Sequence, residues 1–113
     1  MAPRWCIILL FLCSTGLAQA EVSYNKDVLP ILAGKCFACH DADEAERKAG
    51  LRLDDSKVAY AERNGVRAIV PGKVNESALI TRIFASDDEV MPPQSAKNPL
   101  TRQEKSTLRQ WIE

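Results

Sequence analysis

The segment Cys36–His40 constrains this chain more than any other, because two thiols lie three residues apart and an imidazole follows them directly. Two intervening residues let the backbone span one edge of a porphyrin, so each thiol can add to one vinyl group on that edge. The next side chain then lies under the iron, where a neutral imidazole is a strong axial ligand. The motif therefore predicts a covalent haem c on Cys36 and Cys39, with His40 as an axial ligand.

The same side chains leave other kinds of site open. A structural zinc site has four nitrogen or sulfur ligands, whereas Cys36, Cys39 and His40 supply three. A thioredoxin-type redox pair is expected in a βαβ setting, whereas the apolar residues before the motif recur at helical spacing. A local Cys36–Cys39 disulfide in an exported, haem-free interaction module is a further alternative.

The first twenty residues have the pattern of a secretory signal peptide. Arg4 precedes the apolar run Trp5–Leu12, and Ala18–Ala20 has the small-x-small form of a cleavage site. The apolar run is shorter than the roughly 20 residues of a membrane-spanning helix, so cleavage is favoured over anchoring. We expect residues 1–20 to be removed and residues 21–113 to form an exported, periplasmic or cell-envelope domain without a membrane span.

Met91 is the candidate for the second axial position. It is the one methionine of residues 21–113 and lies between the acidic run Asp87–Glu89 and two prolines. The prolines fix φ and hold the preceding residue extended, which gives a rigid loop able to aim a thioether. A core-filling role is the alternative, but the pattern favours Met91 as sixth iron ligand, a ligation that raises the potential.

The apolar periodicity predicts a mainly α fold of about four short helices with little or no β-structure. A domain this small has a marginal core of its own, which a covalent haem would complete. The formal charge is balanced, with 15 basic and 15 acidic residues, so it gives no reason to expect a nucleic-acid partner. The first predicted helix is Ser23–Lys35, which is firm from Val28 with Asp27 as N-cap. The second is Ser56–Arg63, capped by Asp54 or Asp55 and ended by Asn64–Gly65. The third is Glu76–Ala85 with Asn75 as N-cap, and a last helix follows a Thr101/Glu104 capping box.

Several segments resemble the planctomycete-type cytochrome c domain, a class I-like cytochrome c. They run in the family's order across the whole of residues 21–113: Tyr24–Leu32, Cys36–His40, Ala49–Asp54, Ile69–Gly72, Ser77–Ile80, Met91–Pro93 and Leu108–Ile112. The resemblance implies a small helical cytochrome c fold with covalent haem on Cys36 and Cys39 and with His40 and Met91 as axial ligands. In this family the module is commonly the N-terminal part of longer exported proteins, so the expected partner is a fused domain or a separate redox protein.

The expected function is that of a mono-haem domain that carries single electrons and is not itself an enzyme. An enzyme or small-ligand sensor is the alternative if Met91 leaves the sixth iron site open. The acidic run Asp87–Glu89 is expected either to steer a basic redox partner or to be a plain soluble loop.

Two details depart from common cytochrome patterns. Asp41–Ala42 follows the motif where family members often have Gly-Pro. Many simpler cytochromes c use a proline carbonyl shortly after the motif to accept the second ring N–H of the haem histidine, whereas the next proline here is the distant Pro71. We therefore expect a main-chain carbonyl of Ala49–Leu53 to accept this N–H of His40. Arg52 and Arg67 are either haem propionate partners or solvated arginines, with solvation favoured.

Overall fold

The computed structural model describes residues 16–17, 20–40 and 50–113. The predicted signal peptide falls largely outside these residues, and so do Asp41–Ala42 and Ala49. None of the described helices is long and apolar enough to cross a membrane. The elements are η1 (Tyr24–Val28, π-helical), α1 (Leu29–Lys35), α2 (Ser56–Ala59), β1 (Glu62–Arg63), β2 (Val66–Arg67), η2 (Val74–Glu76, a 3-10 turn), α3 (Ala78–Ile83) and α4 (Arg102–Ile112).

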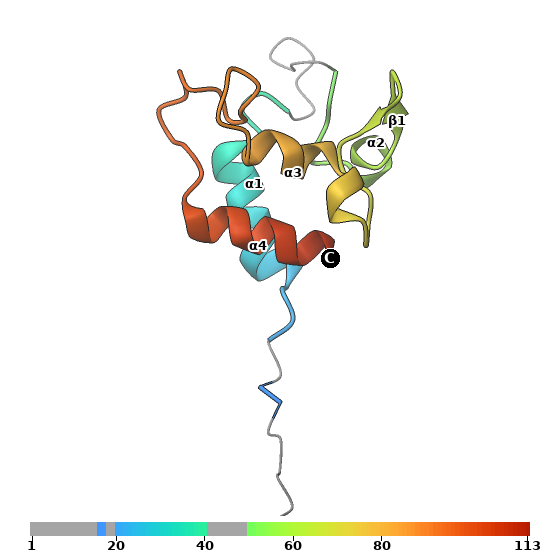
Figure 1. Cartoon of the computed structure of the whole chain (residues 1–113), viewed down its shortest axis with the longest axis vertical. Coiled ribbons are helices and arrows are strands. Elements are labelled where there is room, and N and C mark those ends of the chain that lie inside the picture. Colours follow the sequence, from blue (N-terminus) through green and yellow to red (C-terminus); the bar gives the residue numbers. More distant parts are fainter. Residues whose placement is uncertain (1–15, 18–19, 41–49) are drawn as a thin grey trace, which may run out of the picture.

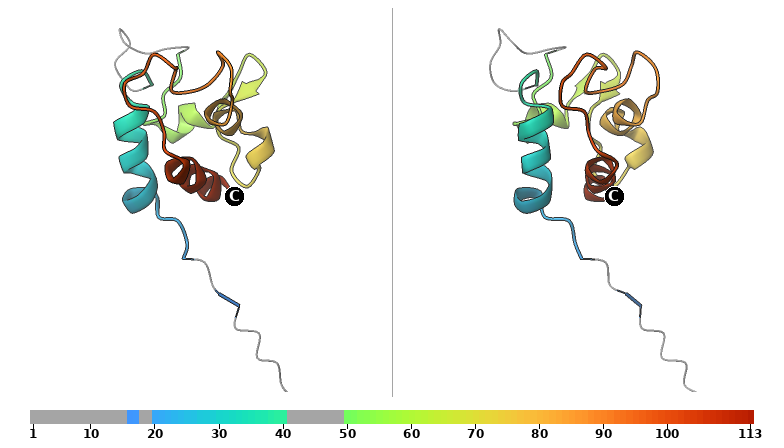
Figure 2. Two further views of the ribbon diagram at one scale, coloured as in Figure 1. Left: turned by 60° about the vertical axis from the view of Figure 1, so that its left-hand side comes forward. Right: turned by 90° about the vertical axis from the view of Figure 1, so that its left-hand side faces the viewer.

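The described residues confirm a mainly helical fold, in which α1, α3 and α4 surround a shared apolar core (Figure 1). In the two turned views α4 again lies beside α1 (Figure 2). Burial of these side chains drives the packing of elements that are too short to be stable alone. The buried apolar residues are Val28, Ile31, Leu32, Leu53, Ala59, Ile69, Leu79, Ile80, Ile83, Leu100, Leu108 and Ile112.

The first helical segment begins with the π-helical η1, and α1 follows it directly. The Ser23 side chain accepts the Lys26 N–H, and the Asp27 carboxylate accepts the Ser23 N–H at 2.8 Å. Asp27 is therefore not the N-cap, and that prediction was wrong. Pro30 lies in the first turn of α1, where a missing N–H costs little, so the helix passes this proline without a break.

A β-hairpin replaces the second half of the predicted helix Ser56–Arg63. Asp55 caps α2 as expected, but α2 ends after one turn and β1 pairs antiparallel with β2. Asn64 and Gly65 join the strands with φ of 53° and 79°. Two successive residues at positive φ are typical of the hairpin turn that Asn-Gly favours. Asn64–Gly65 therefore reverses a hairpin, and the prediction that it ends a helix was wrong.

A buried hydroxyl fixes the start of α3. The Ser77 side chain accepts the Val70 N–H at 2.9 Å and donates to Lys73 O at 3.0 Å, and Ser77 is fully buried. Buried polar groups need partners, and these partners hold Ser77 directly before α3. The predicted start at Glu76 with Asn75 as N-cap was wrong, because η2 ends where that helix was expected to begin.

The start and packing of α4 agree with the sequence prediction. Thr101 N–H donates to the Glu104 carboxylate at 2.8 Å, and Glu104 N–H donates to the Thr101 hydroxyl at 3.1 Å. This reciprocal pair is the predicted capping box. The Trp111 ring lies 5.6 Å from the Tyr24 ring, centroid to centroid, so Trp111 packs the last helix on the first, as expected.

Lys35 links the end of α1 to the start of α4. Its ammonium donates to Asn98 Oδ1 at 2.6 Å and to Pro99 O at 2.8 Å, and lies 3.5 Å from the Glu104 carboxylate. The Lys35 side chain is only 12% exposed, so these contacts are poorly screened by water. Since Cys36 follows Lys35, the same contacts fix the position of the predicted attachment motif.

Lys35→Met is expected to lower the free energy of unfolding by about 2–3 kcal/mol, because hydrogen bonds to a charged group contribute about 1.5–3 kcal/mol. Urea unfolding followed by circular dichroism measures the change. Lys97→Met removes an exposed lysine of the neighbouring loop and is expected to change stability by less than about 0.5 kcal/mol. Equal losses in the two variants would contradict the role of Lys35.

Candidate cofactor site

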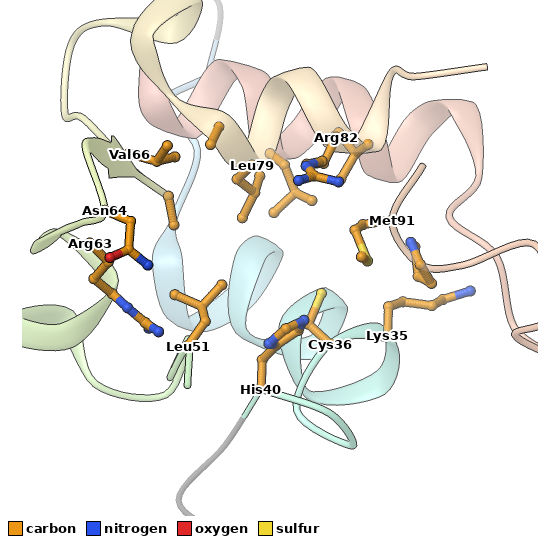
Figure 3. Close-up of a pocket in the computed structure, with 15 residues that line it drawn as sticks. Lys35, Cys36, His40, Leu51, Arg63, Asn64, Val66, Leu79, Arg82 and Met91 are labelled. Carbon is orange, nitrogen blue, oxygen red and sulfur yellow. The ribbon is translucent and has the colours of Figure 1, made fainter. Parts of the chain in front are cut away.

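A cavity of about 360 Å³ lies among the end of α1, the hairpin, α3 and the loop after α3 (Figure 3). Its volume falls within the roughly 300–1,000 Å³ range of cofactor sites. Cys36 and His40 lie on one side and Leu79 on the opposite side, and Met91 enters from the loop after α3. The structure thus brings together three of the four predicted site residues.

The attachment motif continues α1 as a tight turn. Cys36 N–H donates to Leu32 O at 2.9 Å, and His40 N–H donates to Cys36 O at 2.9 Å. This turn directs the Cys36 and His40 side chains into one cavity, whereas Cys39 is exposed and lies outside its lining. Both thiols are free. The motif therefore presents one thiol to the cavity and one to the surface.

The surroundings of Cys36 disfavour a catalytic redox thiol. Burial, the neighbouring Cys39 and the Glu104 carboxylate raise the pKa of Cys36 to about 11. At neutral pH this thiol is protonated, whereas catalytic redox thiols act as thiolates. Within the described ranges, no three His, Cys, Asp or Glu side chains are placed to hold a metal ion.

His40 is fixed at the edge of the core by its main chain. Leu53 N–H donates to His40 O at 2.8 Å, and Leu53 is itself a buried core residue. The ring atom Nδ1 of His40 is also buried. The segment expected to support His40 therefore does lie beside it. The acceptance of the ring N–H by a carbonyl of Ala49–Leu53 stays a prediction.

The loop that carries Met91 is attached to the end of α3. Met91 N–H donates to Arg82 O at 3.0 Å. Within the loop, Val90 N–H donates to Asp87 O at 3.2 Å, and Glu89 N–H donates to the Asp87 carboxylate at 3.0 Å. These bonds hold the backbone around a half-buried Met91, so its thioether has a defined position at the cavity.

The sequence profile of the family described as Planctomycete cytochrome C matches residues 36–95, more than half of the chain. The chain belongs to this family. The match contains Cys36–His40 and Met91 and makes the chain a c-type cytochrome domain. Family membership implies haem c as the cofactor and suggests electron transfer rather than catalysis. Searches of curated proteins and of solved structures found no match.

The cavity of this cytochrome has the chemistry that a haem requires. Leucine, isoleucine and valine side chains form much of its lining, as apolar porphyrin faces need. Among the described lining residues, the charged side chains are the basic Lys35, Arg63 and Arg82. A haem carries two propionate carboxylates, so an apolar cavity with basic residues and two neutral ligand side chains fits this group.

The basic residues at the cavity are not those singled out from the sequence. Arg52 pairs with Asp54 at 2.8 Å and with Asp55 at 3.8 Å, and Arg67 is exposed on β2. Neither lines the cavity. The favoured solvated interpretation fits the exposed Arg67, whereas Arg52 is 28% exposed and lies in ion pairs. The missed Arg63 lies next to Asn64–Gly65, and reading that dipeptide as a hairpin turn would have set Arg63 on a strand beside the site.

Gly50 permits the observed position of Arg63. Gly50 has φ +62°, and a Cβ there would lie 2.7 Å from Arg63 Nη2. Gly50→Ala is expected to lower the free energy of unfolding by about 1–2 kcal/mol, since left-handed backbone is strained for alanine. Urea unfolding tests this, with Gly34→Ala as the control because its Cβ would meet nothing within 4 Å. Equal stability of the two variants would contradict the expectation.

Proposed function

We propose that this chain is a mono-haem c-type cytochrome domain that carries single electrons. In this proposal Cys36 and Cys39 bind the haem covalently, and His40 and Met91 are the axial iron ligands. The observation that carries it is the convergence of Cys36, His40 and Met91 on one largely apolar cavity within the region that matches the family. When bound, the haem supplies a reversible one-electron iron couple.

Each proposed residue has a distinct task. Cys36 and Cys39 keep the cofactor attached, and their two-residue spacing matches one porphyrin edge. His40 supplies an imidazole nitrogen and Met91 a thioether sulfur, which are both neutral ligands. A neutral sulfur ligand stabilises ferrous relative to ferric iron, so this pair favours a high potential.

The cavity walls exclude water from the proposed site. Leu51, Leu79, Ile83 and Leu108 line it from three different parts of the chain, and Leu79, Ile83 and Leu108 are buried core residues. A low-dielectric environment disfavours extra charge on the iron centre. These side chains therefore tune the potential as well as complete the core.

Export and partner choice are parts of the same proposal. We infer that residues 1–20 direct residues 21–113 to the periplasm or cell envelope, where haem c domains of this family typically work. The electron donor and acceptor are a separate redox protein or a fused domain. The acidic run Asp87–Glu89 lies in the Met91 loop, a place from which it can attract a basic partner.

The proposal is tested on protein produced together with a cytochrome c maturation system. Intact mass under denaturing conditions is expected to exceed the mass of residues 21–113 by one haem. Spectroelectrochemical titration is expected to give one reversible one-electron transition. A mature mass without haem would overturn the proposal, and a ferric spectrum of a five-coordinate iron would favour the enzyme or sensor alternative.

A further inference from the structure

We propose that Arg82 is a positioning residue for Met91, acting together with Glu89. This inference rests on the proposed axial ligation by Met91. Arg82 contacts the Met91 loop through both its main chain and its side chain. The two contacts come from one residue of a helix that buries Leu79, Ile80 and Ile83 in the core, so they connect the ligand loop to the core of the domain.

The main-chain contact completes the end of α3. The last carbonyls of a helix have no partner within it, and α3 ends at Ile83, one residue after Arg82. Arg82 O accepts the Met91 N–H at 3.0 Å. The same carbonyl also accepts the Ala85 N–H at 3.3 Å. The Met91 N–H is therefore the shorter of two bonds at this carbonyl, and it ties the backbone of the proposed ligand residue to the end of the helix.

The side-chain contact holds the loop two residues before Met91. The Arg82 guanidinium donates to Glu89 O at 3.4 Å and forms an ion pair with the Glu89 carboxylate. Arg82 is 46% exposed and Glu89 is 63% exposed, so the ion pair alone contributes little. The ion pair acts by fixing Glu89 against α3. Met91, two residues further on, is bound to the same helix through its own N–H.

The helix α3, which carries Arg82, is packed firmly into the core. On α3, Leu79, Ile80 and Ile83 are each less than a tenth exposed and belong to the core. The loop's other hydrogen bonds, through Asp87, join residues within the loop and so shape it without attaching it to a helix. Arg82 therefore sets the distance between Met91 and the opposite wall with His40.

The expected consequence concerns competition for the sixth iron site. An added ligand such as imidazole binds ferric iron only when the Met91 sulfur has left, so its apparent affinity scales with the fraction of open loop. Loss of one hydrogen bond and one exposed ion pair is expected to raise that apparent affinity about three- to tenfold. The far-red absorption band of the Met–iron bond is expected to weaken over a lower temperature range.

The experiment titrates ferric holoprotein with imidazole by absorption for wild type, Arg82→Leu and Glu89→Gln. Arg82→Leu removes the guanidinium and leaves an apolar side chain at the cavity, and Glu89→Gln changes a residue outside the cavity lining. Arg82→Lys keeps the charge and is expected to give an affinity closer to wild type. Asp88→Asn is the matched control, because it removes the same charge from the same loop and leaves the Arg82–Glu89 pair in place.

Raised imidazole affinity in Glu89→Gln and Arg82→Leu, with Asp88→Asn near wild type, supports the positioning role. Imidazole affinities within about twofold of wild type in both variants overturn the positioning role. If the wild-type protein still shows the far-red band in that case, the proposed ligation by Met91 is unaffected. An equal rise in Asp88→Asn assigns the effect to net charge and also overturns the positioning role. A wild-type ferric protein without the far-red band overturns the axial role of Met91 and with it the role of Arg82.

Discussion

Exported Cys36→Ala/Cys39→Ala protein is expected to carry no covalent haem, whereas wild type carries one. The double variant has no thiol left in residues 21–113, so no thioether can form. Without the covalent cofactor a domain of this size has a marginal core. Intact mass under denaturing conditions measures the attachment, and acidic organic extraction should remove all haem from the variant and none from wild type.

Single variants separate the two attachment points. Cys36→Ala and Cys39→Ala each retain one thiol, so each is expected to hold haem through one thioether and in lower yield than wild type. Ala38→Ser is the control, because it changes an exposed residue between the thiols and preserves their spacing. Covalent haem in the double variant, or its absence from Ala38→Ser, would contradict attachment through this motif.

Features encoded within a few residues were predicted well. The Thr101/Glu104 capping box and the apolar stripe of α4 depend on neighbours along one helix, and both were found. The mainly helical fold followed in the same way from apolar periodicity. The convergence of Cys36 and His40 was also predictable, because one turn of backbone separates them.

Features that depend on contacts outside a single helix were missed. Asn64–Gly65 is compatible with a helix end and with a hairpin turn, and the pairing of β1 with β2 decides between them. Ser77 begins α3 because its hydroxyl reaches Val70, a contact that local capping preferences do not reveal. The role of Arg82 depends on the path of the loop after α3, which the spacing of residues does not define.

The cavity extends beyond the region that matches the family. The match covers residues 36–95, yet Lys35 and Leu108 also line the cavity. Lys35 is held by Asn98 and Glu104, so the segments on either side of the matched region contact each other next to the predicted attachment motif. The site is therefore a product of the whole described domain, and stability and cofactor retention are expected to change together.

Met91→Ala is expected to lower the reduction potential by on the order of 0.1 V, since axial ligands shift haem potentials over about 0.8 V. Loss of the neutral sulfur removes the preference for ferrous iron that His/Met ligation provides. The far-red band of the ferric protein is expected to disappear. Spectroelectrochemistry measures the potential, and absorption of the ferric protein at neutral pH measures the band.

The same variant decides between an electron carrier and a sensor. With the sulfur gone, imidazole no longer competes with an internal ligand, and its apparent affinity is expected to rise on the order of a hundredfold. Val90→Ala is the control, because it shortens the neighbouring side chain and keeps the thioether. If wild type and Met91→Ala bind imidazole equally and share one potential, Met91 is not the sixth ligand. An open sixth site would then favour the sensor function, because it can bind a small ligand. An electron carrier keeps both axial positions filled and binds no added ligand.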